Sequence, residues 1–277
     1  MRHLLAMLLL LFSIAVNAQE TAKIRVTYEL DNLSNNKKFR AKNAWALDIG
    51  DTTAIFYTPN ERNAVPLIDS IKKRITEDMR LFIAKRKEIL DKYPGGYPMQ
   101  VLRGLPQAGM NTCLRDDCGQ QYMLYECKDP MVDWEMEDSV KTVCGYACQK
   151  AVGKLYGRMW TVWFAEDFAL SYGPFVLGGL PGMILEAYDA DNIYHYTAIG
   201  IERLENGPAI KLFKEYYKVL ECSREQYLKA RENFKNMTNE EYLKRAGITT
   251  QGSPARKVTS GKAMGNTSRE RFYLDLE

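Results

Sequence analysis

The chain has 277 residues, 38 of them basic and 35 acidic, and a formal net charge of +3 at pH 7. The length is enough for one large domain with a substantial core, or for two small ones. The near balance of charges argues neither for nor against an acidic partner. Because the basic residues are scattered rather than gathered into one stripe, nucleic-acid binding has little support. The sequence contains no P-loop, dinucleotide-binding fingerprint or GxSxG nucleophile elbow, and we predict no cofactor.

Residues 1–18 have the pattern of a secretory signal peptide. Arg2 precedes the almost wholly apolar run Leu4–Val16, and small residues lie at Val16 and Ala18, before the expected cut. The apolar run is shorter than the roughly 20 residues that cross a bilayer. We predict cleavage after Ala18, a periplasmic or secreted protein, and no transmembrane segment in the mature chain. An uncleaved anchor is the alternative.

Hydrophobic periodicity predicts three strands and then a long helix. Lys23–Leu30 alternates apolar and polar residues as a half-buried strand does, and Asn43–Ile49 and Thr53–Thr58 are further strands. Between Pro66 and Pro94 the period changes, and a run of apolar residues spaced three or four apart indicates one amphipathic helix of about seven turns. The charged side of this helix is most simply exposed to solvent. A role at a membrane surface is the alternative.

The middle of the chain is predicted as a long loop followed by a series of strands. Pro94–Gly119 has no clear period and forms the loop. The predicted strands are Gln121–Cys127, Val132–Glu137, Tyr146–Tyr156, Arg158–Ala165, Met183–Asp189, Ile193–Leu204 and Ile210–Leu220. Asn206-Gly207 is a favoured hairpin dipeptide and joins the last two. Because most connections are short, neighbouring strands are expected to be antiparallel.

Two short helices are predicted after the last strand. Ser223 with Gln226, and Thr238 with Glu241, each match the capping box that starts a helix. Residues 247–277 are mostly polar and are predicted to form a mobile tail. Within the tail, Phe272–Leu276 alternates briefly and is a candidate edge strand.

The cysteine content indicates disulfides. In an oxidising compartment an even number of cysteines favours disulfides, and close spacing suggests local bridges from Cys113 to Cys118 and from Cys144 to Cys148. The spacings match neither a CxxC redox motif nor a zinc ribbon. A thiol metal site or free thiols are the alternatives, and we assign no metal site. The full set of disulfide candidates is Cys113, Cys118, Cys127, Cys144, Cys148 and Cys222.

The most distinctive segment is Gly173–Ile184, with the sequence GPFVLGGLPGMI. Glycine adopts positive φ without steric cost, and proline fixes its own φ and restricts its neighbour. A segment that combines both and stays apolar predicts a specific turn that is either buried or bound. It would plug one end of a sheet, or it would serve as a gate or docking surface.

The hexapeptide Gly179–Ile184, together with residues from Gly145 to Glu186, resembles the GLPGLI family of exported bacterial proteins. Met183 stands where the family usually has leucine, a swap that roughly conserves volume. The resemblance implies an exported protein of Gram-negative bacteria with a β-rich domain and no established reaction. The strand order is also similar to that of periplasmic lipid and lipoprotein carriers, whose curved sheet encloses an apolar cavity.

The predicted fold is therefore α+β. It consists of a predominantly antiparallel curved β-sheet, comparable to a lipoprotein-carrier half barrel, with one long and two short helices. The predicted organisation is a signal peptide over residues 1–18, a single β-rich GLPGLI-type domain over 19–246, and the tail over 247–277.

Groups able to do acid–base or metal chemistry are few. His195 is the only histidine after residue 18, so a multi-histidine site within the mature chain is excluded and a structural role on a strand is preferred. A cation site at Asp189–Asn192 lacks the full calcium-loop pattern. The candidates for a carboxylate pair flank the distinctive segment and are Glu166, Asp167, Glu186, Asp189 and Asp191.

The leading functional hypothesis is a non-enzymatic carrier of a hydrophobic ligand. Trp160 and Trp163 fall on opposite faces of one strand, so at least one can lie outside the core and line an apolar groove. The alternatives are an envelope module that recruits a membrane protein partner, and a hydrolase based on Glu166 and Glu186. The predicted ligand- or partner-binding residues are Trp163, Phe175, Gly179, Leu180, Pro181, Gly182, Met183 and Ile184.

Overall fold

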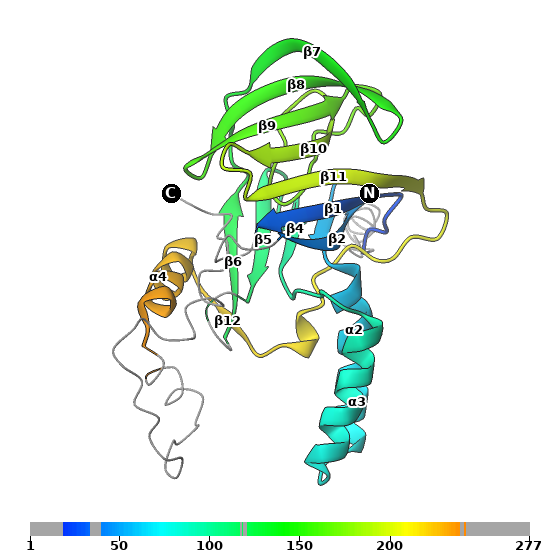
Figure 1. Ribbon diagram of the computed structural model, residues 1–277, viewed down its shortest axis with the longest axis vertical. Coiled ribbons are helices and arrows are strands. Elements are labelled where there is room, and N and C mark those ends of the chain that lie inside the picture. The colour runs from blue at the N-terminus through cyan, green and yellow to red at the C-terminus, as the bar shows by residue number, and fades with distance from the viewer. Residues whose placement is uncertain (1–18, 34–39, 117, 119–120, 239–240, 242–277) are drawn as a thin grey trace, which may run out of the picture.

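The computed structural model describes residues 19–33, 40–116, 118, 121–238 and 241 (Figure 1). The predicted signal peptide, the tail over 247–277 and its edge strand lie outside the described residues. So does the helix predicted after Thr238, except for the capping contacts between Thr238 and Glu241. Among the described helices, none has the length and apolar character needed to span a bilayer.

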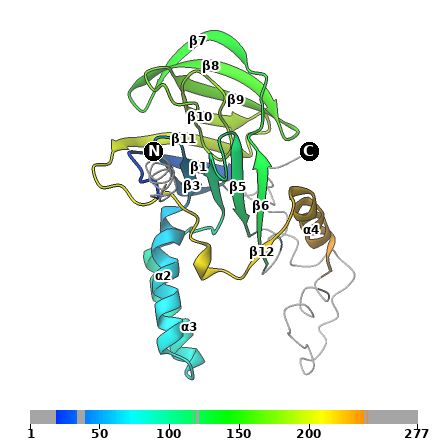
Figure 2. The same cartoon turned by 180° about the vertical axis from the view of Figure 1, so that it is seen from behind.

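The described chain is built on one twelve-stranded sheet with the order β12-β6-β5-β4-β3-β2-β1-β11-β10-β9-β8-β7. All neighbours pair antiparallel except β12, which runs parallel to β6. The sheet is strongly curved, so that β7–β10 run across the direction of β4–β6 (Figures 1 and 2). The strands are β1 Ile24–Leu33, β2 Arg40–Ile49, β3 Ala54–Tyr57, β4 Gln100–Arg103, β5 Met110–Arg115, β6 Tyr122–Lys128, β7 Glu135–Val143, β8 Tyr146–Leu155, β9 Arg158–Ala165, β10 Met183–Asp189, β11 Tyr194–Arg203 and β12 Val219–Glu221. The predominantly antiparallel, curved sheet is therefore confirmed.

The prediction of one long helix is wrong. The segment forms two helices, α2 Pro59–Arg74 and α3 Met79–Lys92, which pack against each other as a hairpin. The break has a local cause, because the Asp78 carboxylate accepts a hydrogen bond from the Leu81 N–H at 2.9 Å and so starts a new helix. The apolar spacing that suggested one continuous helix is instead divided between the two antiparallel helices α2 and α3.

Two stretches after the helical hairpin were also predicted wrongly. Pro94–Gly119 is not a loop, because it contains β4 and β5. The residues after Asn206-Gly207 do not form a hairpin strand; Ala209 makes an isolated bridge to Thr21, and the 3₁₀-helix η1 Lys214–Tyr216 and short β12 follow. Val132–Glu137 captures only the beginning of β7. The short helix α4 Arg224–Asn236 is confirmed, with the capping box at Ser223.

The inner face of the curved sheet encloses the main hydrophobic core. Large side chains from distant strands meet there, including Tyr28, Phe56, Trp160 and Tyr196. A second, smaller core lies on the other face of β2–β4, under the segment that follows β11. Because β3 is buried on both faces, it shows no alternation of apolar and polar residues.

Candidate functional site

The connection between β9 and β10 contains the distinctive Gly/Pro segment, and its large side chains belong to the main core. Phe175, Leu180, Met183 and Ile184 are almost completely buried among the residues of that core. These four predicted binding residues therefore pack in the core. Pro181 and Gly179 are exposed, while Gly182 is buried.

Hydrogen bonds hold this segment in one conformation. The buried Arg103 guanidinium donates to the Leu177 carbonyl at 2.9 Å, and the Trp134 indole N–H donates to the Gly178 carbonyl at 2.8 Å. Gly179 adopts a φ of +86°, and its N–H donates to Ser171 Oγ. Neither Arg103 nor Trp134 was singled out in the sequence, because their partners are backbone atoms far away along the chain.

A polar and aromatic cluster lies on the outer face of β7–β11, the face opposite the one that carries Trp160. It contains the predicted site residue Trp163, and we define it as the Glu186 cluster: Lys141, Trp163, Glu186, Tyr188 and His195. Glu186 Oε1 lies 2.8 Å from His195 Nε2, and Glu186 Oε2 lies 2.5 Å from Lys141 Nζ. The Lys141 ammonium lies 4.4 Å from the centre of the Trp163 ring, and the rings of Tyr188 and His195 are 5.2 Å apart.

Strand register brings these side chains together. Trp160 points into the core while Trp163, three residues later on β9, points outward and is half-buried, as the alternation predicted. An irregularity between Ile184 and Glu186 shifts the β10–β9 register, so that Glu186 lies opposite Trp163. The same strand pairs Tyr188 with His195 of β11.

The electrostatics of the cluster favour an ionised carboxylate. Glu186 is 8% exposed, and burial by itself raises the pKa of its carboxyl. The hydrogen bonds from His195 and Lys141 outweigh this effect, so the pKa of Glu186 lies below its ordinary value of 4.5. Near neutral pH the group is therefore a hydrogen-bond acceptor, and it is poorly suited to donate a proton as a general acid.

The remaining predicted acids differ in burial. Glu166, Asp167 and Asp191 are exposed. Asp189 is buried, and it accepts from Arg158 at 2.8 Å and from the backbone N–H groups of Ile193 and Tyr194 at the β10–β11 turn. Asp189 therefore has a structural role.

The cysteines lie in or against the main core. Cys113 and Cys127 belong to the neighbouring strands β5 and β6. Cys144 lies in the β7–β8 turn, and Cys148 lies in β8. Burial raises the pKa of the Cys148 thiol to about 11, so this thiol is protonated near neutral pH and is a poor nucleophile. The described residues contain no group of three His, Cys, Asp or Glu side chains suited to a metal ion. The disulfides stay a prediction.

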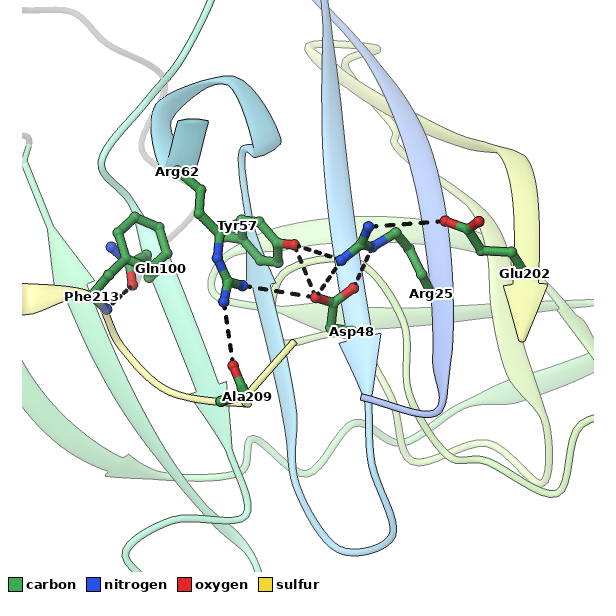
Figure 3. Close-up of polar contacts among 8 residues, drawn as sticks. All are labelled: Arg25, Asp48, Tyr57, Arg62, Gln100, Glu202, Ala209 and Phe213. Carbon is green, nitrogen blue, oxygen red and sulfur yellow. Dashed lines mark hydrogen bonds and ion pairs between the residues drawn. The ribbon is translucent and has the colours of Figure 1, made fainter. Parts of the chain in front are cut away.

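A second polar cluster surrounds Asp48 on the face that carries the smaller core (Figure 3). Asp48 is fully buried and accepts from Arg25 Nε at 2.6 Å and from Tyr57 Oη at 2.9 Å. The Arg62 guanidinium of α2 lies 3.8 Å from Asp48, over the Tyr57 ring, and donates to the Ala209 carbonyl. Burial raises the pKa of Tyr57 to about 12. Because the Asp48 carboxylate already accepts its hydrogen bonds from groups of the protein, the Asp48 cluster has a structural role. It holds α2 and the segment that follows β11 on the sheet.

Comparisons with known proteins gave one family match and similar solved structures. The family described as N-glycanase peptide, N-terminal domain, matches residues 131–222, about a third of the chain, and this part contains the whole Glu186 cluster. Two solved structures, of PNGF-II in space groups P21 and C2, superpose with TM-scores of 0.49 and 0.48 at 11% identity over 77% of this chain. The chain spans about a third of the length of those proteins, 34% and 33%. No curated protein matches. Membership of the GLPGLI family stays a prediction.

Proposed function

We propose that this protein is an exported, non-enzymatic binding module that holds a glycan, free or attached to a peptide, on the outer face of β7–β11. The observation that carries the proposal is the Glu186 cluster. It combines an ionised carboxylate, two nitrogen donors and two partly exposed aromatic rings on one face of the sheet.

These groups match the chemistry of a sugar. Sugar hydroxyls both donate and accept hydrogen bonds, so they need an acceptor such as Glu186 and donors such as Lys141. The apolar C–H faces of a sugar ring pack on amphipathic aromatic side chains, a role open to Trp163 and Tyr188. The match to a domain described as part of an N-glycanase supports the same ligand class, since the matched residues include the cluster.

The cluster fits a glycan better than it fits the hydrophobic-carrier or the hydrolase hypothesis. A hydrophobic ligand near the Gly/Pro segment requires Leu180 and Met183 to be accessible, and both are buried in the core. A hydrolase that uses Glu186 as a general acid requires a raised pKa, and the contacts of Glu186 lower it. We therefore favour binding over catalysis.

The test is calorimetric titration of the mature protein with a free N-glycan, a peptide carrying that glycan, and the bare peptide. Glu186→Gln should weaken glycan binding about tenfold, because charge-assisted hydrogen bonds become neutral ones. Met159→Ala is the matched control, since Met159 lies on the same face of β9 and is exposed; it should bind as wild type does.

Two results would contradict the proposal. The first is the absence of glycan binding, or binding that Glu186→Gln leaves unchanged. The second is that the wild-type protein releases the glycan from the peptide, as measured by mass spectrometry, and that the Glu186→Gln variant does not. That outcome would make the protein an enzyme.

A further inference from the structure

The helical hairpin α2–α3 projects away from the sheet (Figures 1 and 2). Among the described residues of α3 none is buried, and in α2 only Ala64 is. The hairpin therefore contributes little to the core, and its length needs another explanation.

The base of the hairpin is fixed to the domain. Arg62 contacts Asp48 and the Ala209 carbonyl, and Glu61 accepts a hydrogen bond from Tyr217 Oη at 2.8 Å. Thr58, just before α2, exchanges hydrogen bonds with the backbone of Tyr97, just after α3. These contacts hold both ends of the hairpin, so the free half is presented in a defined direction.

Charge is distributed unevenly along the hairpin. The distal half, residues 69–87, has seven basic and three acidic residues, a net charge of +4. The parts near the sheet, residues 59–68 and 88–92, have two basic and three acidic residues, a net charge of −1. The positive charge therefore lies away from the sheet.

Exposed apolar side chains occupy the same distal half. Met79 is 65% exposed, Leu81 45% and Ile83 59%. Met79 and Ile83 lie one helical turn apart, on the same side of α3. Exposed basic residues lie in the same distal half, among them Lys72 of α2 and Arg80 of α3. An apolar ridge flanked by lysine and arginine is the pattern of a helix that lies in a membrane interface.

We propose that the distal half of the α2–α3 hairpin docks on the surface of an anionic phospholipid bilayer. Met79 and Ile83 enter the region between headgroups and acyl chains, and the basic residues of the distal half meet the lipid phosphates. Leu81 lies two residues from each of them and projects from another side of α3. Charge complementarity selects this partner, because each lysine or arginine near an anionic surface adds to the attraction. This inference is independent of the glycan proposal, since the hairpin and the Glu186 cluster belong to different elements.

The experiment is co-sedimentation of the mature protein with vesicles of phosphatidylcholine alone, or with phosphatidylglycerol as a third of the lipid. We expect binding to the anionic vesicles that falls as salt is raised, and much weaker binding to the neutral ones. Lys72→Glu/Arg80→Glu should reduce binding at least about a hundredfold, at roughly fivefold per unit of charge. Lys154→Glu/Lys229→Glu makes the same charge change at exposed positions outside the hairpin and should cost far less.

A second pair of variants tests the apolar side chains at constant charge. Met79→Ser/Ile83→Ser should weaken binding about tenfold. The control Met159→Ser/Ile199→Ser makes the same residue changes at exposed positions of the sheet, 45% and 59% exposed, and should bind as wild type does. No vesicle binding, equal binding to neutral vesicles, or equal losses in the variants and their controls would overturn the proposal. All four should keep the wild-type melting temperature.

Discussion

Removing the Asp48 carboxylate should lower the free energy of unfolding more than removing an ion pair at the surface does. The Asp48→Ala variant deletes the acceptor of hydrogen bonds from Arg25 and Tyr57, and it leaves the Arg25 and Arg62 guanidinium groups close together without their shared acid. Removing one partner of a fully buried ion pair costs about 3–5 kcal/mol. Because Arg25 and Arg62 keep 26% and 23% side-chain exposure, water offsets part of this cost, and we expect about 2–3 kcal/mol.

The assay is urea unfolding followed by tryptophan fluorescence, with the free energy of unfolding taken from the midpoint at a shared slope. Asp51→Ala is the matched control, because Asp51 pairs with Lys23 at the same 2.6 Å but both side chains are more than half exposed. An exposed pair contributes at most about 1 kcal/mol. Adding Arg25→Met to Asp48→Ala removes one of the two stranded charges and should recover part of the loss.

The reasoning fails if Asp48→Ala loses no more stability than Asp51→Ala. In that case burial of the cluster would not strengthen its contacts, and the hairpin base would have to be held by packing alone.

Three further changes test other parts of the structure. Glu186→Gln should cost most stability near pH 7 and progressively less as pH falls below 4.5, because the folded-state pKa of Glu186 is lowered and its stabilising contribution is lost on protonation; a pH-independent cost in urea unfolding would contradict this. Gly182→Ala should lower the unfolding free energy by about 2–3 kcal/mol, since the new Cβ would lie 2.3 Å from the Ala165 carbonyl oxygen, whereas Gly200→Ala, with open space around it, should cost little. Ser223→Ala should remove the α4 cap and cost about 1 kcal/mol, with Ser223→Asp retaining most of the stability; equal losses in the two variants would argue against the cap.

Strands with one buried face could be predicted closely. β8, β9 and β10 begin where the sequence predicted, and β8 ends one residue earlier. In β8 and β9 the alternation reports burial, because each has one face in the core, whereas β10 is buried at six of its seven residues. β3 and β4 are buried on both faces, so neither alternates, and β4 could not be distinguished from a loop.

Which residues come together in the candidate site could be predicted less well from the sequence. Alternation alone places Trp160 and Trp163 on opposite faces of β9. The meeting of Glu186 with His195 and Lys141 depends on the register shift within β10 and on β7, whose bounds were predicted wrongly. A single sequence carries no direct signal for a register between strands that are separated by long connections.

The position of β1 also determines when the sheet can be completed. β1 lies between β2 and β11, and Tyr28 donates a hydrogen bond to the Ile184 carbonyl, 156 residues further along the chain. Until residue 203 has been synthesised, the amino-terminal half of the chain is a partial sheet with one edge of β1 unpaired. Pairing across so long a connection is slow, and an unpaired apolar edge is prone to aggregate. We therefore expect the nascent chain to depend on holding chaperones until β11 has been synthesised, and truncations that end before β11 to be insoluble.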